Sequence, residues 1–117
     1  MYNTDELLEK TEINGKELEY LLSQRNIGRA KFLLVDVREE YEYNQKRIVG
    51  VDYLIPLSDF FNKTQQIEDY KSEHIIAKCK LGGRSAQAQM LLKRMGFKSV
   101  INLAGGITKF SGDIKQK

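Results

Sequence analysis

The chain contains 117 residues, 41% of them apolar and 30% charged, a composition that fits one globular domain over residues 1–117. Its formal net charge of +3 is small, and the lysines and arginines are spread among acidic residues, which argues against nucleic-acid binding. No apolar run approaches the roughly 20 residues of a membrane-spanning helix, and the N-terminal segment lacks the features of a signal peptide. A single cysteine excludes an internal disulfide, so we expect a cytoplasmic protein with a reduced thiol and no membrane association.

The first part of the chain predicts a capped helix followed by a buried strand. Asn14 is a suitable N-cap, and Glu17 lies three positions further on, where it can complete a capping box. Leucines at helical spacing over residues 18–22 form one face of this helix. The nearly continuous apolar run over residues 32–37 predicts a strand covered on both faces, and residues 39–43 fit a short helix.

The middle of the chain predicts shorter elements. Residues 51–55 alternate weakly and stop at Pro56, which indicates a strand. We expect Ser58 to cap a short helix after this proline. Residues 67–70 fit a brief helical turn.

The last part carries the strongest helix signal. An apolar strand over residues 75–79 precedes a helix at 84–95, and Gly96 stands where a C′ glycine is expected. A final strand is predicted at 100–103. A short helix around residues 108–110 follows it.

Strands that alternate with amphipathic helices predict an α/β domain, with a mainly parallel central sheet and helices on both faces. Sites in such sheets lie beyond the carboxyl ends of the strands. Cys79 lies at one such end and residues 36–38 lie at another, which is consistent with a single pocket. We expect residues 115–117 to be a frayed tail.

A seven-residue segment after the predicted strand at 75–79 carries the chemistry: Cys79-Lys80-Leu81-Gly82-Gly83-Arg84-Ser85. Backbone N–H groups and the positive end of a helix dipole gather at a strand-to-helix junction, and they favour anions. The thiolate is an anion, and it is the nucleophilic form of cysteine. The two glycines allow a tight turn with amides directed inward. The segment therefore predicts a reactive thiol at Cys79.

Four segments occur in the order and spacing of known motifs. They are the Cys79–Ser85 loop, the Asp-Val-Arg strand end within residues 35–41, the Ile-Val-Gly-Val run that leads to Ile-Pro at 48–56, and the glycine pair within 102–107. In these segments the chain resembles the rhodanese-like domain family, over about residues 12–112. The resemblance implies a rhodanese-like fold.

The resemblance also implies a sulfurtransferase in which Cys79 carries a persulfide. Loop amides, the helix dipole and Arg84 would stabilise the negative charge. The expected donor is an anion, thiosulfate or a protein persulfide, and the expected acceptor is cyanide or a thiol, with a sulfur-relay protein as a further partner. No metal and no organic cofactor is needed.

Several loop residues have two open interpretations. Lys80 is either a solvated residue or an aid to anion capture, and Leu81 either caps the core or lines the pocket mouth. Ser85 either starts the helix or donates a hydrogen bond to the sulfur. We expect Asp36 and Arg38 to support the site by charge-assisted hydrogen bonds rather than to react.

The sequence departs from the family pattern near this site. Arg47 stands where the family often has histidine, Lys46 where it often has glycine, and Phe110 where tryptophan is common. The two cations add positive charge that could face the pocket and favour an anionic donor.

Two other functions remain open. One is a rhodanese-like docking or regulatory module without turnover, although such modules typically lack the cysteine. The other is a small cysteine phosphatase or arsenate reductase. Those related enzymes have five residues between the cysteine and the arginine, whereas four lie between Cys79 and Arg84 here, and the shorter loop fits a sulfur atom better than a phosphate group.

Overall fold

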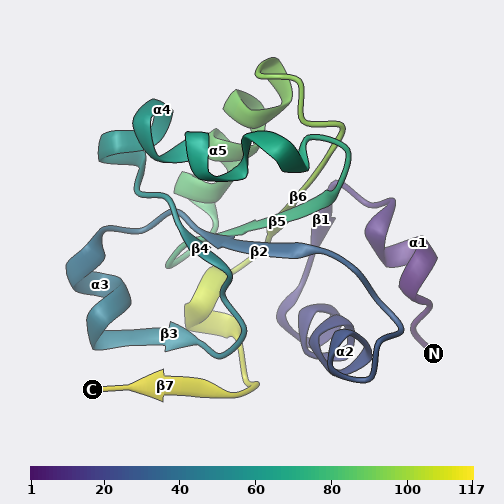
Figure 1. Ribbon diagram of the computed structural model, residues 1–117. Coiled ribbons are helices and arrows are strands. Elements are labelled where there is room, and N and C mark those ends of the chain that lie inside the picture. The colour runs from purple at the N-terminus through teal and green to yellow at the C-terminus, as the bar shows by residue number, and fades with distance from the viewer.

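The computed structural model describes residues 1–117, and Figure 1 shows a central sheet with helices on its two faces. The strands are β1 (Glu12–Ile13), β2 (Leu33–Asp36), β3 (Lys46–Ile48), β4 (Tyr53–Leu54), β5 (His74–Lys78), β6 (Ser99–Leu103) and β7 (Ile114–Gln116). The α-helices are α1 (Thr4–Leu8), α2 (Gly15–Asn26), α3 (Glu40–Gln45), α4 (Phe60–Lys63) and α5 (Gly83–Arg94). Short 3-10 helices are η1 (Leu57–Asp59), η2 (Thr64–Tyr70) and η3 (Gly106–Lys109). No helix is both long enough and apolar enough to cross a membrane.

The main sheet has five strands in the order β1-β6-β5-β2-β4, and every pair in it is parallel. The predicted α/β class with a mainly parallel sheet is therefore confirmed. Because all five strands run the same way, β2, β5 and β6 end at one edge of the sheet, where a site is expected. A second, two-stranded sheet pairs β3 with β7 in antiparallel fashion.

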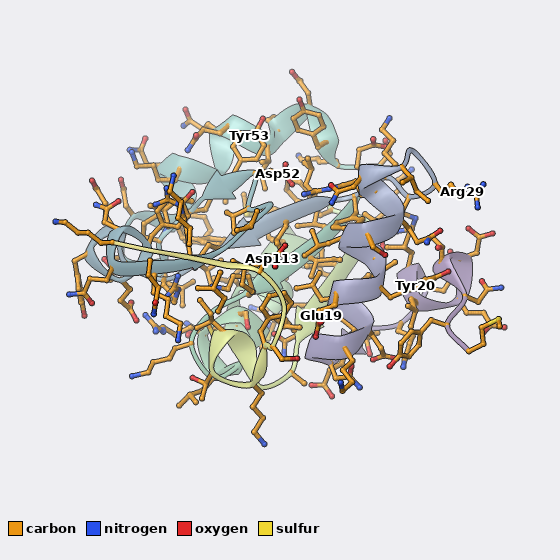
Figure 2. The ribbon with its side chains drawn as sticks, turned by 90° about the horizontal axis from the view of Figure 1, so that it is seen from below. Glu19, Tyr20, Arg29, Asp52, Tyr53 and Asp113 are labelled. Carbon is orange, nitrogen blue, oxygen red and sulfur yellow. The ribbon has the colours of Figure 1, made fainter.

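Side-chain alternation along β5 divides the core into two layers. Ile75 and Cys79 pack on the side of α4 and α5, which lie above the sheet in Figure 1. Ile76 packs on the opposite side, with α1, α2 and η3. Figure 2 views the molecule from that second side, with Glu19 and Tyr20 on α2 in front of the sheet. Helices on both faces explain why the middle strands β2, β5 and β6 carry apolar residues on both of their faces.

The predicted helix signals are present at both long helices. The side chain of Asn14 accepts a hydrogen bond from the Glu17 amide at 2.9 Å, and the Asn14 amide donates to the Glu17 carboxylate at 2.9 Å. At the end of α5, Gly96 adopts a φ of +98°, and the Phe97 amide donates to the Leu92 carbonyl at 3.1 Å. These contacts are a capping box and a Schellman motif, so both predictions are confirmed.

Two local predictions are wrong. The tail is not frayed, because residues 114–116 form β7, pair with β3, and place Ile114 against the core. Backbone pairing holds this segment, and its polar sequence gives no sign of it. Ser58 does not cap α4 either. It lies inside η1, and its hydroxyl donates to the Glu39 carboxylate at 2.6 Å.

Candidate active site

Cys79 lies in the loop between β5 and α5. The strand ends at Lys78 and the helix begins at Gly83, so the thiol occupies the predicted strand-to-helix junction. The side chain is a free cysteine and only 1% exposed. Its environment therefore depends on the backbone groups that surround the sulfur rather than on solvent.

Two backbone amides point at the sulfur. The N–H of Gly82 donates to Cys79 Sγ at 3.0 Å, and the N–H of Ser85 does so at 3.4 Å. Gly82 reaches this orientation with a φ of +108°, a region that residues with a Cβ rarely adopt. A Cβ there would also lie 3.3 Å from the Gly105 nitrogen, so the position suits glycine on two grounds.

Two further amides of the loop have no protein acceptor. The N–H groups of Gly83 and Arg84 begin α5, a helix of 12 residues, and donate to no backbone or side-chain atom. Unpaired N–H groups in the first turn of a helix carry the positive end of its dipole. An anion next to Cys79 Sγ would thus meet free donors.

Ser85 joins the sulfur to the neighbouring strand. Its hydroxyl is buried, with Oγ lying 3.3 Å from Cys79 Sγ and 2.5 Å from Oδ1 of Asn102 on β6. One hydroxyl proton can serve only one acceptor at a time. The direction of the Ser85 O–H bond is therefore coupled to the ionisation of Cys79. Sequence reasoning quoted Asn102 within a motif but did not place it at the site.

These contacts favour the thiolate. Burial opposes ionisation and is the largest single influence, but hydrogen bonds from the Ser85 hydroxyl and from the backbone amides of Ser85 and Gly82 outweigh it. Together they lower the pKa of the Cys79 thiol below its ordinary value. The site can therefore supply a nucleophilic sulfur.

Arg84 does not stand free in the loop. Its guanidinium makes a two-pronged ion pair with Glu42 of α3, with Nη1–Oε1 at 2.6 Å and Nη2–Oε2 at 2.8 Å. Hydrogen bonds from Arg84 lower the pKa of Glu42 to about 2. Much of the charge that sequence reasoning assigned to the sulfur is thus neutralised by Glu42. Sequence reasoning missed Glu42, and its only signal was its place on the predicted short helix.

A buried charged cluster lies at the ends of β2 and β5. The expected charge-assisted bonds are present: Arg38 Nη2 donates to Asp36 Oδ2 at 2.8 Å, and Arg38 Nε donates to Asp36 Oδ1 at 3.1 Å. Lys78 Nζ also donates to Asp36 Oδ2, at 3.0 Å. Lys78 was not anticipated, because it lies in an apolar strand.

A cavity of about 290 Å³ lies beside the loop. Its lining residues are Arg38, Tyr41, Glu42, Gln45, Lys46, Lys80, Ile107 and Thr108. Lys46 thus lines a cavity next to the loop, as does Lys80. Arg47 does not line it; its guanidinium instead lies 4.6 Å from the centre of the Tyr43 ring. Leu81 is 65% exposed and so does not cap the core.

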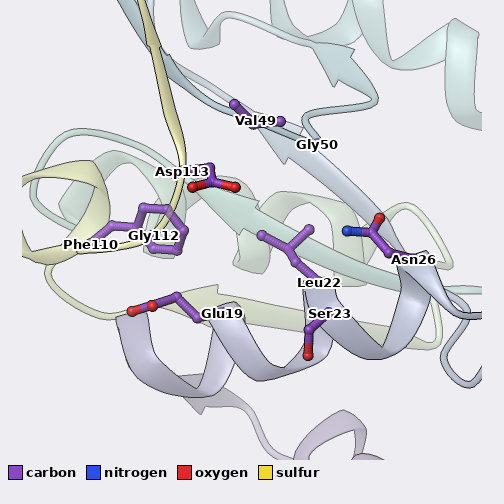
Figure 3. Close-up of a pocket in the computed structure, with 9 residues that line it drawn as sticks. All are labelled: Glu19, Leu22, Ser23, Asn26, Val49, Gly50, Phe110, Gly112 and Asp113. Carbon is purple, nitrogen blue, oxygen red and sulfur yellow. The ribbon is translucent and has the colours of Figure 1, made fainter.

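Figure 3 shows a second cavity, of about 220 Å³, on the side of α2. Glu19 and Leu22 line it from α2, and Phe110 and Asp113 line it from the segment that leads into β7. None of its lining residues belongs to the Cys79–Ser85 loop. Phe110 is only 7% exposed and packs in the core.

The glycine pair after β6 supports the loop from behind. The amide of Ile107 donates to the Cys79 carbonyl at 3.0 Å, and the amide of Thr108 donates to the Lys80 carbonyl at 3.1 Å. A Cβ on Gly106 would overlap both of these carbonyl oxygens. Glycine therefore allows the two loops to lie in direct backbone contact.

Curated relatives cover the chain to different extents. The chain is 35% identical over 79 residues to the Bacillus subtilis protein named "Putative sulfur carrier protein YrkF", covering 68% of this chain and 41% of that protein. It is 32% identical over 108 residues to the Schizosaccharomyces pombe protein named "Putative thiosulfate sulfurtransferase, mitochondrial", covering 84% and 76%. It is also 32% identical over 111 residues to the tRNA uridine(34) hydroxylase of Buchnera aphidicola, covering 90% of this chain but only 33% of that enzyme.

A solved structure and a family model also match this chain. The solution structure of the rhodanese-like domain of an Anabaena protein matches with a TM-score of 0.78 at 24% identity, covering 92% of this chain and 80% of that one. At this identity the likeness shows the fold. The family model for the rhodanese-like domain matches residues 17–113. With this match over most of its length, the chain belongs to the rhodanese-like domain family.

Proposed function

We propose that the protein is a sulfurtransferase that carries sulfane sulfur as a persulfide on Cys79. The observation that carries this proposal is the set of backbone amides around one buried sulfur. Gly82 and Ser85 donate to Cys79 Sγ, while the amides of Gly83 and Arg84 are free to receive a second anionic atom. Relatives named as a sulfur carrier and as a thiosulfate sulfurtransferase are consistent with this chemistry.

The proposed reaction has two steps. In the first, the Cys79 thiolate attacks the outer sulfur of thiosulfate, an S–S bond forms to Cys79, and sulfite leaves with the electron pair of the broken S–S bond. In the second, cyanide or a thiolate attacks the outer sulfur, and Cys79 leaves as a thiolate. Each step is a displacement at sulfur in which no net oxidant or reductant is consumed, and the nucleophile is the thiolate form that the site favours.

The persulfide is held mainly by main-chain groups in this proposal. The outer sulfur carries the negative charge, and the free N–H groups at the start of α5 supply donors for it. Arg84 supports the loop through Glu42 rather than acting as a free cation beside the sulfur. This assigns Arg84 a supporting role and Cys79 the only covalent one.

The donor is proposed to be an anion. Lys46 and Lys80 line the cavity beside the loop, and neither forms an ion pair, whereas Glu42 in the same cavity is neutralised by Arg84. The cavity thus has an excess of positive charge, which suits thiosulfate or the persulfide of a sulfur-relay protein. The acceptor is proposed to be cyanide or a thiol.

Sulfur loading tests the proposal directly. After incubation with thiosulfate, the intact mass of the protein should increase by one sulfur atom, and a reducing thiol should remove it. The Cys79→Ser variant should gain no sulfur. Since Cys79 is the only cysteine, loading of this variant would show that the sulfur is not held as proposed.

The same samples separate the alternatives. Hydrolysis of a generic phosphate ester without sulfur loading would identify a phosphatase instead. A wild-type protein that neither loads sulfur nor hydrolyses esters would favour a docking module. The hydroxylase named above is about three times as long as the segment it shares with this chain. Hydroxylation is therefore not part of the proposed function.

A further inference from the structure

One buried charge near the site is not used by the mechanism above. Lys78 directly precedes Cys79 on β5 and is 0% exposed. Successive residues of a strand point to opposite faces, so the ammonium lies on the side of the sheet opposite to the sulfur. Its only hydrogen bond goes to Asp36, which is equally buried. Lys78 is therefore a cation held in the core next to the reactive cysteine.

The cluster around Lys78 carries a net positive charge. Asp36 provides one negative charge, and it is shared between Arg38 and Lys78. Arg38 takes both oxygens of the carboxylate and is 4% exposed. Two buried cations and one buried anion leave one positive charge without a full partner. Of the other charged groups near the loop, Arg84 is paired with Glu42, whereas Lys46 and Lys80 form no ion pair and line the cavity beside it.

A buried cation without a full partner is costly, and an apolar side chain at position 78 would avoid this cost. The neighbouring residues Ile75, Ile76 and Ala77 show that the strand is otherwise apolar. A lysine is explained if its charge stabilises a negative charge nearby. Asp36 and Arg38 act on the charge of Lys78 from the same buried cluster, and the ionised form of Cys79 acts on it from the other face of the sheet.

We propose that Lys78 is an electrostatic positioning residue that stabilises the anionic form of Cys79 from the opposite face of the sheet. For the persulfide, this inference rests on the function proposed above; for the thiolate, it does not. Burial lowers the pKa of Lys78 to about 8, so the ammonium is still mainly protonated at neutral pH. Charge on Cys79 in turn raises the pKa of Lys78, which is the same interaction seen from its other end.

The test is the thiol pKa of Cys79, measured from the pH dependence of its alkylation by iodoacetamide. In the Lys78→Met variant the thiol pKa should rise by roughly 0.5 to 1 unit, the effect of removing one buried charge from the residue next to Cys79 in the chain. At a pH below the thiol pKa of both proteins this corresponds to alkylation slower by roughly 3- to 10-fold. Thiosulfate loading at the same pH should slow by a similar factor.

Two further variants separate charge from structure. Lys78→Gln keeps a neutral hydrogen-bond donor on a slightly shorter side chain and removes the charge, so it should raise the thiol pKa as Lys78→Met does. Lys93→Met removes an exposed lysine from the end of α5 and should leave the thiol pKa unchanged. Circular dichroism and thermal melting confirm that each variant is folded.

The inference is overturned if both Lys78 variants keep the wild-type thiol pKa, or if Lys93→Met shifts it equally. A shift in Lys78→Met without a shift in Lys78→Gln would also overturn it, because the hydrogen bond rather than the charge would then matter. Alkylation needs no sulfur donor. If wild-type protein fails to load sulfur while the Lys78 variants still shift the thiol pKa, the proposed function falls and the role of Lys78 toward the thiolate stands.

Discussion

Two loops follow the carboxyl ends of neighbouring strands, β5 and β6, and they use their backbone N–H groups in different ways. The loop after β5 directs the amides of Gly82 and Ser85 at a sulfur and leaves those of Gly83 and Arg84 free. In the loop after β6, backbone N–H groups donate hydrogen bonds to protein carbonyls, including those of Cys79 and Lys80. Both loops contain a glycine pair and both begin a helix. The first loop is thus built to receive an anion, and the second to hold the first in place.

This difference shows that a glycine pair has no fixed role. Gly83 has open space around its Cα, whereas Gly106 is in contact with the backbone of the other loop. The comparison predicts that a glycine-to-alanine substitution will destabilise the protein strongly in the second loop and little or not at all in the first. It can be tested by changing one loop at a time.

The largest effect is expected at the contact between the loops. In Gly106→Ala the new methyl group would overlap the carbonyl oxygens of Cys79 and Lys80, so the loops must separate. We expect the free energy of unfolding to fall by about 2 to 4 kcal/mol. Sulfur loading should be largely lost, because the amides around Cys79 move with the loop. Urea denaturation and intact-mass measurement after thiosulfate treatment would show both effects.

Gly83→Ala is the matched control in the other loop. No atom lies within 4 Å of a Cβ built there, and φ is not positive, so alanine fits the first turn of α5. The free energy of unfolding should stay the same or rise by about 0.5 kcal/mol, because alanine restricts the unfolded chain more than glycine does. If Gly83→Ala and Gly106→Ala lowered the free energy of unfolding equally, the proposed difference between the two loops would be wrong.

A smaller effect is expected where α3 holds the start of α5. Glu42→Gln removes the negative charge that pairs with Arg84, and the free energy of unfolding at pH 7 should fall by about 1 kcal/mol, because solvent screens a guanidinium that is 36% exposed. The pKa of Glu42 is lowered to about 2 in the folded protein, from its ordinary value of 4.5. The stability that the pair contributes is therefore present above about pH 4.5 and is lost as the pH falls toward 2.

Denaturation curves measured between pH 7 and pH 2 would test this sign. The difference in stability between the wild type and Glu42→Gln should be constant from pH 7 to about pH 5 and then shrink. A difference that grows on acidification would show that Glu42 is not held as a carboxylate by Arg84. A Glu68→Gln variant is a suitable control, because Glu68 forms an ion pair with Lys71 on the exposed surface.

Most of the fold was predictable because local signals and tertiary structure agree. The capping box at Asn14, the glycine at position 96 and the apolar runs of β2, β5 and β6 each indicate their element without help from the rest of the chain. The pairing of β3 with β7 was not predictable. Both strands are three residues long and largely polar, and they join segments that are far apart in the sequence.

Only the part of the site that is contiguous in the sequence was predictable. The residues of the Cys79 loop are contiguous, so their order and glycine content indicate a turn with inward amides. Glu42, Lys78 and Asn102 belong to other elements, and nothing local shows that they face Arg84, Asp36 and Ser85. Sequence reasoning therefore gave Arg84 a free charge that the fold neutralises. Contacts between separate elements need the register of the sheet, which a single sequence does not supply.

The most local effect is expected at the hydroxyl that links the Cys79 loop to β6. Ser85 lies between Cys79 Sγ and the Asn102 side chain on β6, and its hydrogen bond is the largest influence that lowers the pKa of the Cys79 thiol. In Ser85→Ala this pKa should rise by roughly half a unit to one unit, because burial of the sulfur remains while one donor is lost. Iodoacetamide alkylation, at a pH below the thiol pKa of both proteins, should slow by the corresponding roughly 3- to 10-fold.

The Ser85→Thr variant keeps the hydroxyl and should stay close to the wild-type thiol pKa. Ser23→Ala removes an exposed hydroxyl that donates to the Tyr20 carbonyl, and it should change nothing at the sulfur. The amides of Gly82 and Ser85 remain in Ser85→Ala, so the thiol should stay reactive rather than become inert. An unchanged thiol pKa in Ser85→Ala would mean that main-chain amides alone set the ionisation of Cys79. The loop would then work without its link to β6.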